Sequence, residues 1–266
     1  MLAKYDISMI TIILSTLQFH MVTSLIVSKN PDDIHFYLYS SKSNPTESVE
    51  LIYDKWKLHL QLGRGRNCAR FFEKCNFYLL AYLASNEPGN TILVDWGLLS
   101  TPRGRDAIIL RYPIVALHIP IVAKRIAQFI TNYCQEGLID PENVHLIGQS
   151  LGALGVVGEA GTETRKLSGI PVARITANGG SKQPGCVDSC PGGVSGCAHG
   201  YSYQLMAASI SRPFRSCQCT RAEMGDTCLN SCKNPTYMGQ FCPPAARGQF
   251  YVRTDSLPAT CKSNIN

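Results

Sequence analysis

The first 180 residues of the chain switch repeatedly between two spacings of apolar residues. Stretches that alternate with period two, or that are apolar without interruption, predict β-strands, and apolar residues three or four positions apart predict helices. Pro120 predicts a kink or an early break in one of these helices. The predicted strands cover residues 33–41, 48–63, 89–97, 143–148 and 172–177, and the predicted helices cover 69–85, 113–134 and 151–167.

Strands that alternate with helices imply right-handed crossovers. The chain is therefore predicted to be an α/β protein with a mostly parallel central sheet and flanking helices. The strand at 89–97 is apolar throughout, which is typical of a strand buried on both faces. From Asn178 onward the chain becomes rich in Gly, Pro and Cys, and only residues 202–210 predict a helix there. We expect this Cys-rich tail to wrap the sheet within a single domain.

The first 24 residues have the layout of a secretory signal peptide. Lys4 precedes an apolar run from Ile7 to Leu17, and residues 22–24 offer a cleavage site. The run is shorter than the ~20 residues that span a bilayer, and no later stretch is predicted to span one. We expect a secreted, extracellular protein whose domain covers residues 25–266, with an uncleaved anchor as the alternative.

Cysteine content and charge narrow the possible partners. Of the twelve cysteines, nine lie after residue 185, which favours disulfides in an oxidising compartment. The spacings Cys217-x-Cys219 and Cys228-x3-Cys232 leave a zinc site as the alternative. The formal charge of +6 comes from scattered basic residues, apart from a run at 64–70 that lacks the interleaved aromatic residues of a nucleic-acid surface. We expect no nucleic-acid partner, although a basic surface would favour anionic lipid interfaces.

A serine stands between two glycines at the spacing G-x-S-x-G, where the strand at 143–148 meets the helix at 151–167. Such a turn strains the backbone and can present Ser150 as a nucleophile. Side chains two residues to either side would collide, so Gly148 and Gly152, which flank Gln149 and Ser150, are expected to be required. The amide of Leu151 would donate to an oxyanion. A structural turn is the alternative, but the strand before and the small residues after favour a nucleophile elbow.

With these residues the chain resembles the pancreatic-lipase superfamily, whose elbow usually reads G-H-S-L-G-A-H. The resemblance includes FYLYSS, NTILVDWG, QPGC, GCAHGYSYQLMAASI and ARGQFYVRTD, and therefore runs from about residue 33 to about residue 257. The short Cys-rich tail is most similar to the insect lipase and phospholipase A1 branch. The resemblance implies an α/β-hydrolase that cleaves carboxylic esters of lipids, with phospholipid favoured over triglyceride. It also implies a membrane or lipid interface as partner, and neither a metal nor an organic cofactor.

The resemblance maps the catalytic histidine onto His199, in the segment Cys197-Ala198-His199. A disulfide between Cys186 and Cys197 would hold this loop rigid, and His199 would take the proton of Ser150. His20 falls in the signal segment. Structural roles are expected for the remaining histidines, which are His35, His59, His118 and His145.

The chain departs from the family pattern in two places, so the domain is expected to be incomplete. Family members carry an orienting aspartate in a segment like R-I-T-G-L-D-P-A, whereas here RIT joins ANGG directly, as after an internal deletion, and residues 177–180 are neutral. Asp188 is the nearest possible substitute. The family's H-G-[FWY] loop also has no counterpart, and Gly63 and Gly65 are only guesses for the source of the second oxyanion amide. Loss of the acid costs ~10⁴ in turnover and loss of one oxyanion donor ~10²–10³. A catalytically impaired homologue that binds lipid or another surface is therefore the second interpretation.

Overall fold

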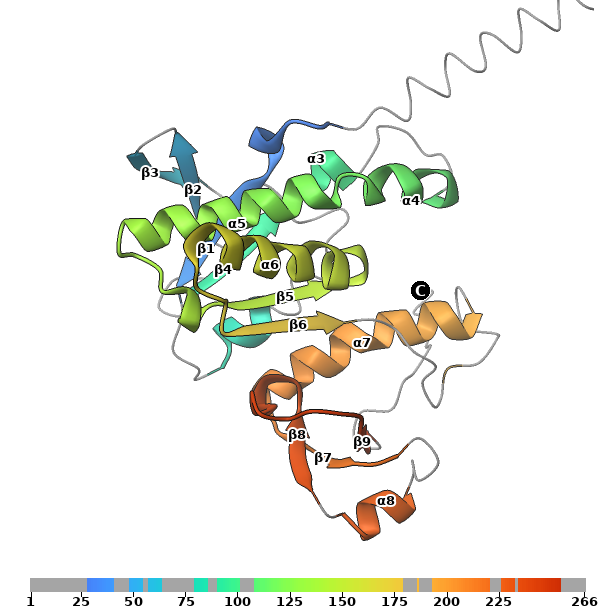
Figure 1. Ribbon diagram of the computed structural model, residues 1–266. Helices are drawn as coiled ribbons and strands as arrows, with labels where there is room; N and C mark the ends of the chain where they lie inside the picture. The colour runs from blue at the N-terminus through green and yellow to red at the C-terminus, as the bar shows by residue number, and fades with distance from the viewer. Residues whose placement is uncertain are drawn as a thin grey trace, which may run out of the picture.

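The computed structural model describes residues 28–40, 48–54, 57–63, 79–85, 90–100, 108–178, 186, 193–220, 226–232 and 234–254 (Figure 1). The predicted signal peptide at 1–24 and the basic run at 64–70 lie outside these residues.

Four strands in the N-terminal half form an antiparallel sheet with the spatial order β3-β2-β1-β4. Only two residues separate β2 from β3, so the run predicted at 48–63 reverses on itself and forms two paired strands. The last strand, β4, pairs with β1 along its whole length and is half-buried, so the prediction of a strand buried on both faces is wrong. The strands are β1 (His35–Ser40), β2 (Ser48–Asp54), β3 (Lys57–Gly63) and β4 (Asn90–Asp95).

Two further strands, β5 (His145–Gln149) and β6 (Arg174–Asn178), pair in parallel through a helical crossover. The crossover ends in α6 (Gly158–Ser168). Among the described residues these are the only parallel neighbours, and the strands form three sheets. The prediction of one mostly parallel central sheet therefore does not hold for the described strands. Short connections impose antiparallel pairing on β2 and β3, whereas β5 and β6 have the long crossover that parallel strands require.

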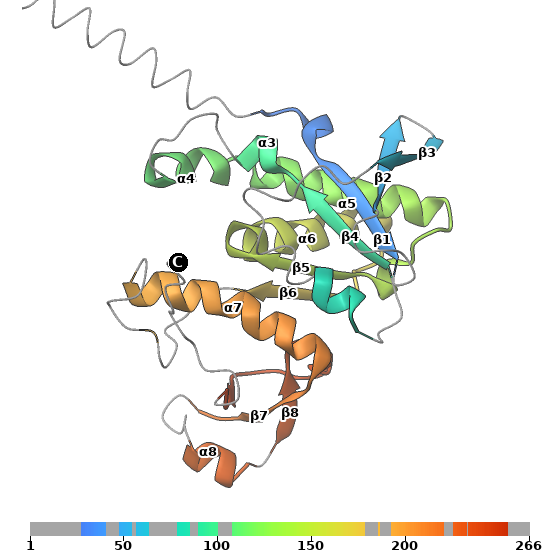
Figure 2. The same cartoon turned by 180° about the vertical axis from the view of Figure 1, so that it is seen from behind.

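The main apolar core lies between these sheets and the long helix α5 (Ile119–Gln135), which lies beside α6 in both views (Figures 1 and 2). Phe129 of α5 stacks on Phe36 of β1 at 4.2 Å between ring centroids and on Tyr133 at 4.4 Å. Val156 and Ala160, which follow the G-x-S-x-G turn, belong to the same core. The segment after Ser150 is thus anchored against the largest apolar cluster of the described chain.

The break predicted near Pro120 is present. Helix α4 (Ile108–Ala116) ends before a turn at Leu117 and His118, and α5 then begins with Pro120 in its first turn, where its missing N–H is not needed. A short helix, α3 (Gly97–Ser100), precedes α4, and the described end of the predicted helix at 69–85 is helical over residues 79–83.

By length and composition, the helical stretch Tyr112–Gln135 is long and apolar enough to cross a membrane. The sequence predicted no membrane-spanning stretch after the N-terminus. By length and composition this stretch qualifies as one, so the prediction is wrong on those two criteria. Half of an 18-residue apolar segment within this stretch is buried inside the protein, and eight side chains of α5 are buried. Its apolar character is accounted for by the core that it forms.

The C-terminal part consists of the helix α7 (Gly193–Ser211) and a three-stranded antiparallel sheet with the order β8-β7-β9. In both ribbon views α7 lies between β6 and this small sheet (Figures 1 and 2). The helix predicted at 202–210 begins nine residues earlier than expected. The elements are β7 (Phe214–Gln218), α8 (Asp226–Asn230), β8 (Pro235–Met238), the 3₁₀ turn η5 (Gly239–Phe241) and β9 (Phe250–Val252).

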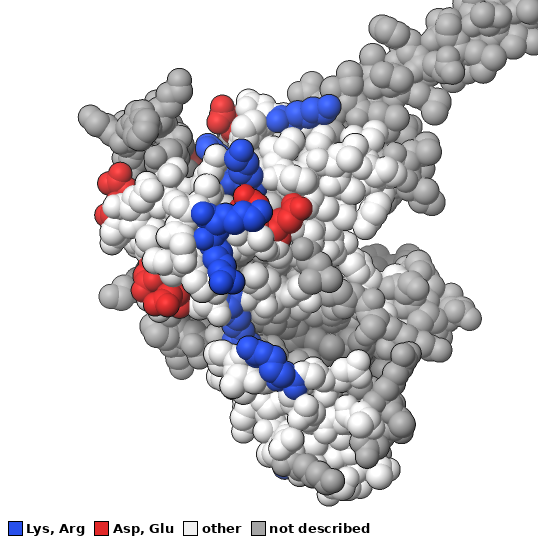
Figure 3. All heavy atoms as spheres, in the orientation of Figure 1, with Lys and Arg blue, Asp and Glu red and all other residues white. Residues whose placement is uncertain are grey.

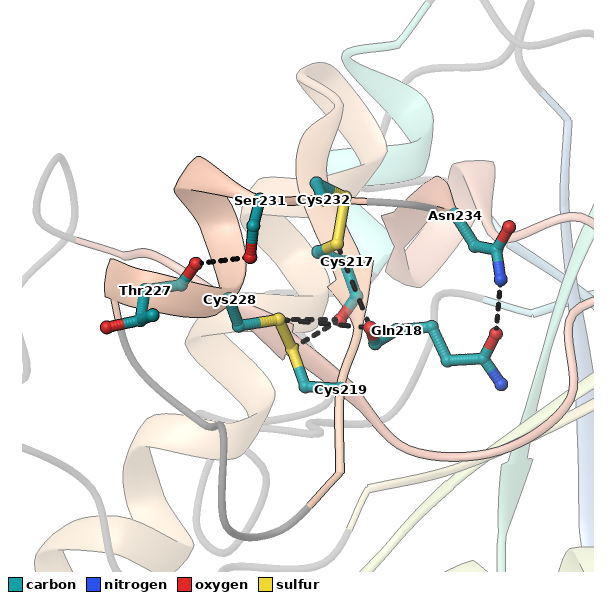
Figure 4. Close-up of a disulfide and its surroundings, with 8 residues drawn as sticks. All are labelled: Cys217, Gln218, Cys219, Thr227, Cys228, Ser231, Cys232 and Asn234. Atoms are coloured by element: carbon teal, nitrogen blue, oxygen red, sulfur yellow. Dashed lines mark hydrogen bonds between the residues drawn. A yellow bond between two sulfur atoms is a disulfide. The ribbon is translucent and has the colours of Figure 1, made fainter.

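Disulfides hold the small sheet to α8. Cys217 pairs with Cys232 and Cys219 pairs with Cys228, while Ser231 donates to the Thr227 carbonyl at 2.8 Å (Figure 4). The four cysteines whose spacing left zinc as an alternative are therefore joined as two disulfides. In the described part of the chain, Cys134 and Cys242 are free thiols.

The 3₁₀ turn at Gly239 and Gln240 joins the C-terminal part to the strand beside the G-x-S-x-G turn. Arg174 of β6 donates to the Gly239 and Gln240 carbonyls, the latter at 2.6 Å. Tyr82 donates to the side-chain oxygen of Gln240 at 2.6 Å, and the backbone N–H of Gln240 donates to Ser209 Oγ of α7 at 3.1 Å. Because Gly239 has a φ of +69°, the turn needs a residue that tolerates the left-handed region.

Basic side chains that are scattered in the sequence gather in space. On the face shown in Figure 3, Lys and Arg form a band that crosses α5 and α6 and continues toward the C-terminal part. Two basic side chains of these helices have acidic partners: Arg125 of α5 lies 3.5 Å from Asp32, and Lys166 of α6 lies 2.6 Å from Glu163. The exposed pairs contribute little to stability because solvent screens them.

Candidate active site

Ser150 begins the turn that leaves β5, and its backbone is strained. Among the described residues it is the one non-glycine residue with a positive φ, at 58°. Gln149 before it is extended, with φ −125° and ψ 145°. A left-handed serine costs about 1–3 kcal/mol, so the surrounding structure has to impose the conformation. The result is an exposed serine at the carboxyl end of a strand.

The two glycines of the motif have different surroundings. A methyl group on Gly148 would overlap the carbonyl of Gly152 and would lie 2.9 Å from the nitrogen of Ala153. Gly152 has no atom within 4 Å of the corresponding position, and its φ of −67° suits any residue. The sequence predicted that both glycines are required. Of these two glycines, only Gly148 has to be glycine, because the backbone of Gly152 and Ala153 folds back over it. The space next to Gly152 is open.

The segment after Ser150 was predicted to be one helix over 151–167. It consists instead of a 3₁₀ turn (Ser150–Gly152), a π-helical turn (Ala153–Val157) and α6. Small residues allow it to pack closely, since a methyl group on Gly155 would lie 2.8 Å from Ile119 of α5. The amide of Leu151 directly follows Ser150 in the 3₁₀ turn, which is the place expected for an oxyanion donor.

His199 lies in α7, next to the turn that carries Ser150. Its backbone carbonyl accepts a hydrogen bond from Gln149 Nε2 at 3.2 Å and another from Ser202 Oγ at 2.8 Å. The sequence placed His199 in a loop; the structure places it inside the helix, because helix formation begins at Gly193. The structure contains the disulfide between Cys186 and Cys197, with 5.6 Å between the Cα atoms. The fold thus places the backbone of His199 within hydrogen-bonding distance of the Gln149 side chain, directly before Ser150.

The carboxyl end of β6 carries a neutral residue. Asn178 is in register with Gln149, and Ala177 is in register with Gly148, so both lie beside the elbow. Asp188, the possible substitute acid, lies outside the described residues, as do Gly179 and Gly180. Within the described chain, Asn178 is the side chain at the end of this strand.

The two candidates for the second oxyanion amide gain no support. Gly63 ends β3 and is in register with Ser48. The strand β3 forms an edge of the four-stranded sheet, which is a different sheet from that of β5. Gly65 lies outside the described residues.

Three other histidines have structural partners. His118 is buried and its Nδ1 lies 2.8 Å from the Leu99 carbonyl, while His35 Nδ1 lies 2.7 Å from Glu50 Oε1. His145 Nε2 lies 2.7 Å from Thr176 Oγ1 across the β5–β6 pair.

Burial, together with the nearby positive charge of Arg174, lowers the pKa of His145 from 6.5 to about 4. His145 is therefore neutral at physiological pH. His59 lies in β3, but its side chain is not among those that the structure describes. His20 lies outside the described residues.

Sequence reasoning missed the role of Gln149 as a link between the elbow and α7. A neutral donor directly before the serine was visible in the sequence, but its partner is 50 residues away along the chain. Only the packing of α7 against the β5–β6 pair brings the two together.

Comparison with known proteins adds an independent line of evidence. A family model described as Lipase matches residues 38–177, a segment that contains Ser150 and both elbow glycines and ends before His199. The lipoprotein lipase of Sus scrofa is 40% identical over 99 residues, which cover 37% of this chain and 18% of that protein. The match thus spans less than a fifth of that relative's length.

Proposed function

Because the chain belongs to the lipase family, we propose that it hydrolyses carboxylic esters of lipids through Ser150. The observation that carries this proposal is the left-handed backbone of an exposed Ser150, held by the fold of Gly148 against Gly152. A serine in an ordinary turn has no need of this strain, which is characteristic of functional sites.

The proposed reaction follows the chemistry of a serine esterase. Ser150 Oγ attacks the acyl carbonyl carbon as His199 takes the hydroxyl proton, and the Leu151 amide donates to the oxyanion. The ester C–O bond then breaks, and the leaving alkoxide takes the proton from His199. A water molecule then attacks the carbonyl carbon of the acyl-serine while His199 takes its proton. The acyl–Oγ bond breaks, His199 returns the proton to Ser150 Oγ, and the fatty acid leaves. The scheme needs no metal and no organic cofactor.

We propose phospholipid, cleaved at the sn-1 acyl ester, as the preferred substrate over triglyceride. This preference follows from the resemblance of the Cys-rich tail to the insect lipase and phospholipase A1 branch. The basic band in Figure 3 supports an interface of anionic lipid, because exposed cations attract such surfaces. Hydrolysis of sn-1-labelled phospholipid vesicles, compared with a triglyceride emulsion, tests the preference.

We further propose that residues 1–24 are removed and that residues 25–266 are secreted. Disulfides at Cys186–Cys197, Cys217–Cys232 and Cys219–Cys228 support an oxidising compartment. Intact mass without reduction tests this part of the proposal. A mass that shows most of the twelve cysteines as free thiols would contradict secretion.

The nucleophile is tested by labelling with a fluorophosphonate probe. We expect the wild-type protein to be labelled at Ser150 and the Ser150→Ala variant to remain unlabelled. Turnover of a short-chain ester should be lost in the same variant. Absence of labelling in folded wild-type protein would refute the enzymatic proposal.

A second function is favoured by Asn178, the neutral residue at the end of β6 beside the elbow. Without an orienting acid, the protein would be a catalytically impaired lipase homologue that binds lipid or another surface. Binding of wild type and Ser150→Ala to phospholipid vesicles, measured together with ester turnover, separates the two functions. Equal binding with no turnover above the Ser150→Ala background supports the binding protein.

A further inference from the structure

The side chain of Gln149 connects the candidate nucleophile to the candidate base. Gln149 is the last residue of β5 and directly precedes Ser150, and its Nε2 donates to the backbone carbonyl of His199 at 3.2 Å. The two residues are separated by 50 positions in the sequence. The hydrogen bond therefore joins β5 to α7, two elements that are far apart in the sequence.

We propose that Gln149 is a positioning residue that sets the distance between Ser150 and His199; this inference rests on the proposed function of those two residues. Gln149 touches neither the substrate nor the reacting atoms in the scheme above. It acts on the backbone of His199, so any movement of α7 relative to the elbow stretches or breaks this bond. Proton transfer between the two side chains is sensitive to such movement, because a misplacement of about 1 Å costs roughly 10²-fold in rate.

The neighbouring sequence explains why this bond matters here. An orienting carboxylate would ordinarily hold the imidazole of the base, but the end of β6 carries Asn178. A restraint on the backbone that carries the imidazole is a different way to limit its position. The carboxamide of Gln149 does not titrate, so this restraint is independent of pH in the range where a histidine base works.

A second donor to the same carbonyl supplies a matched control. Ser202 Oγ donates to the His199 carbonyl at 2.8 Å, but Ser202 lies three residues further along the same helix. It moves with His199 and cannot fix the helix against the elbow. Loss of either donor removes one hydrogen bond from the His199 carbonyl. Only the loss of the Gln149 donor also breaks the connection between β5 and α7.

The test compares Gln149→Met, which keeps the length of the side chain but has no donor, with Ser202→Ala and the wild type. We expect Gln149→Met to lower kcat on a short-chain ester, and the rate of fluorophosphonate labelling, by roughly 10- to 100-fold. The KM and the pH at half-maximal rate should stay within error of the wild type, and the melting temperature should fall by only a few degrees, as in Ser202→Ala. Ser202→Ala should leave kcat unchanged.

Two outcomes would overturn the inference while leaving the proposed function intact. One is a Gln149→Met variant that labels and turns over as fast as a wild type labelled at Ser150. The other is an equal loss of kcat in Gln149→Met and Ser202→Ala, which would show that the carbonyl needs donors in general. A wild type that is not labelled at Ser150 would instead refute the proposed function, and with it the premise of the inference.

Discussion

Alanine at Gly148 should disrupt the elbow, whereas alanine at Gly152 should not. A methyl group on Gly148 would overlap the carbonyl of Gly152 and lie 2.9 Å from the nitrogen of Ala153. These are backbone atoms, so no side-chain rotation can relieve the overlap. The turn has to open by about 1 Å, and overpacking of this kind costs about 1–3 kcal/mol. Gly152→Ala meets open space at a helical φ, where alanine is favoured over glycine by up to about 1 kcal/mol.

Thermal unfolding and fluorophosphonate labelling measure the two effects together. In a domain of this size 1 kcal/mol corresponds to about 2–4 °C, so Gly148→Ala should lower the melting temperature by roughly 2–12 °C. Because Ser150 moves with the turn, its labelling rate should fall by about 10²-fold or more. Gly152→Ala should melt at the wild-type temperature or a few degrees above it, with labelling retained. Equal behaviour of the two variants would refute the assignment of the close contact to Gly148.

Three further predictions concern the strands β5 and β6 and the turn that Arg174 of β6 contacts. Gly239→Ala should lower the melting temperature by several degrees, because its φ is +69° and the added methyl group would overlap the side chain of Ser209; an unchanged melting curve would contradict the packing described for this turn. The pKa of His145 is lowered from 6.5 in the unfolded chain to about 4 in the folded protein, so the unfolded state binds the proton first as pH falls between these values. The free energy of unfolding should therefore drop by up to about 3 kcal/mol between pH 6.5 and 4 and then level off, and urea titrations should show this slope in wild type and lose it in His145→Gln. Asn178→Asp places a carboxylate at the end of β6 beside the elbow and should raise kcat for a short-chain ester by about tenfold or more, dependent on His199; Asn178→Ala is the control, and equal rates in both variants would show that this position does not reach the base.

Local features of the site could be predicted from the sequence. The strand before Ser150, the turn at it and the helical segment after it depend on the spacing of apolar residues and on glycine sterics within about ten residues. The break before α5 also follows from one residue, Pro120. The apolar surroundings of His118 predicted a packed, structural residue, and the structure buries it with its Nδ1 at 2.8 Å from the Leu99 carbonyl, a partner that the sequence did not indicate.

Features that depend on residues far apart in the chain were decided by the tertiary structure. The sequence predicted one mostly parallel sheet, because a strand pattern indicates burial and not which neighbour supplies the hydrogen bonds; pairing of β4 with β1 is a long-range choice. The different surroundings of Gly148 and Gly152 arise only when the chain folds back on itself. The link from Gln149 to His199 has the same physical origin, since a donor finds its acceptor only after α7 packs beside the β5–β6 pair. The local sequence thus determined which residue has a strained backbone, and the packing of distant elements decided which side chains lie next to it.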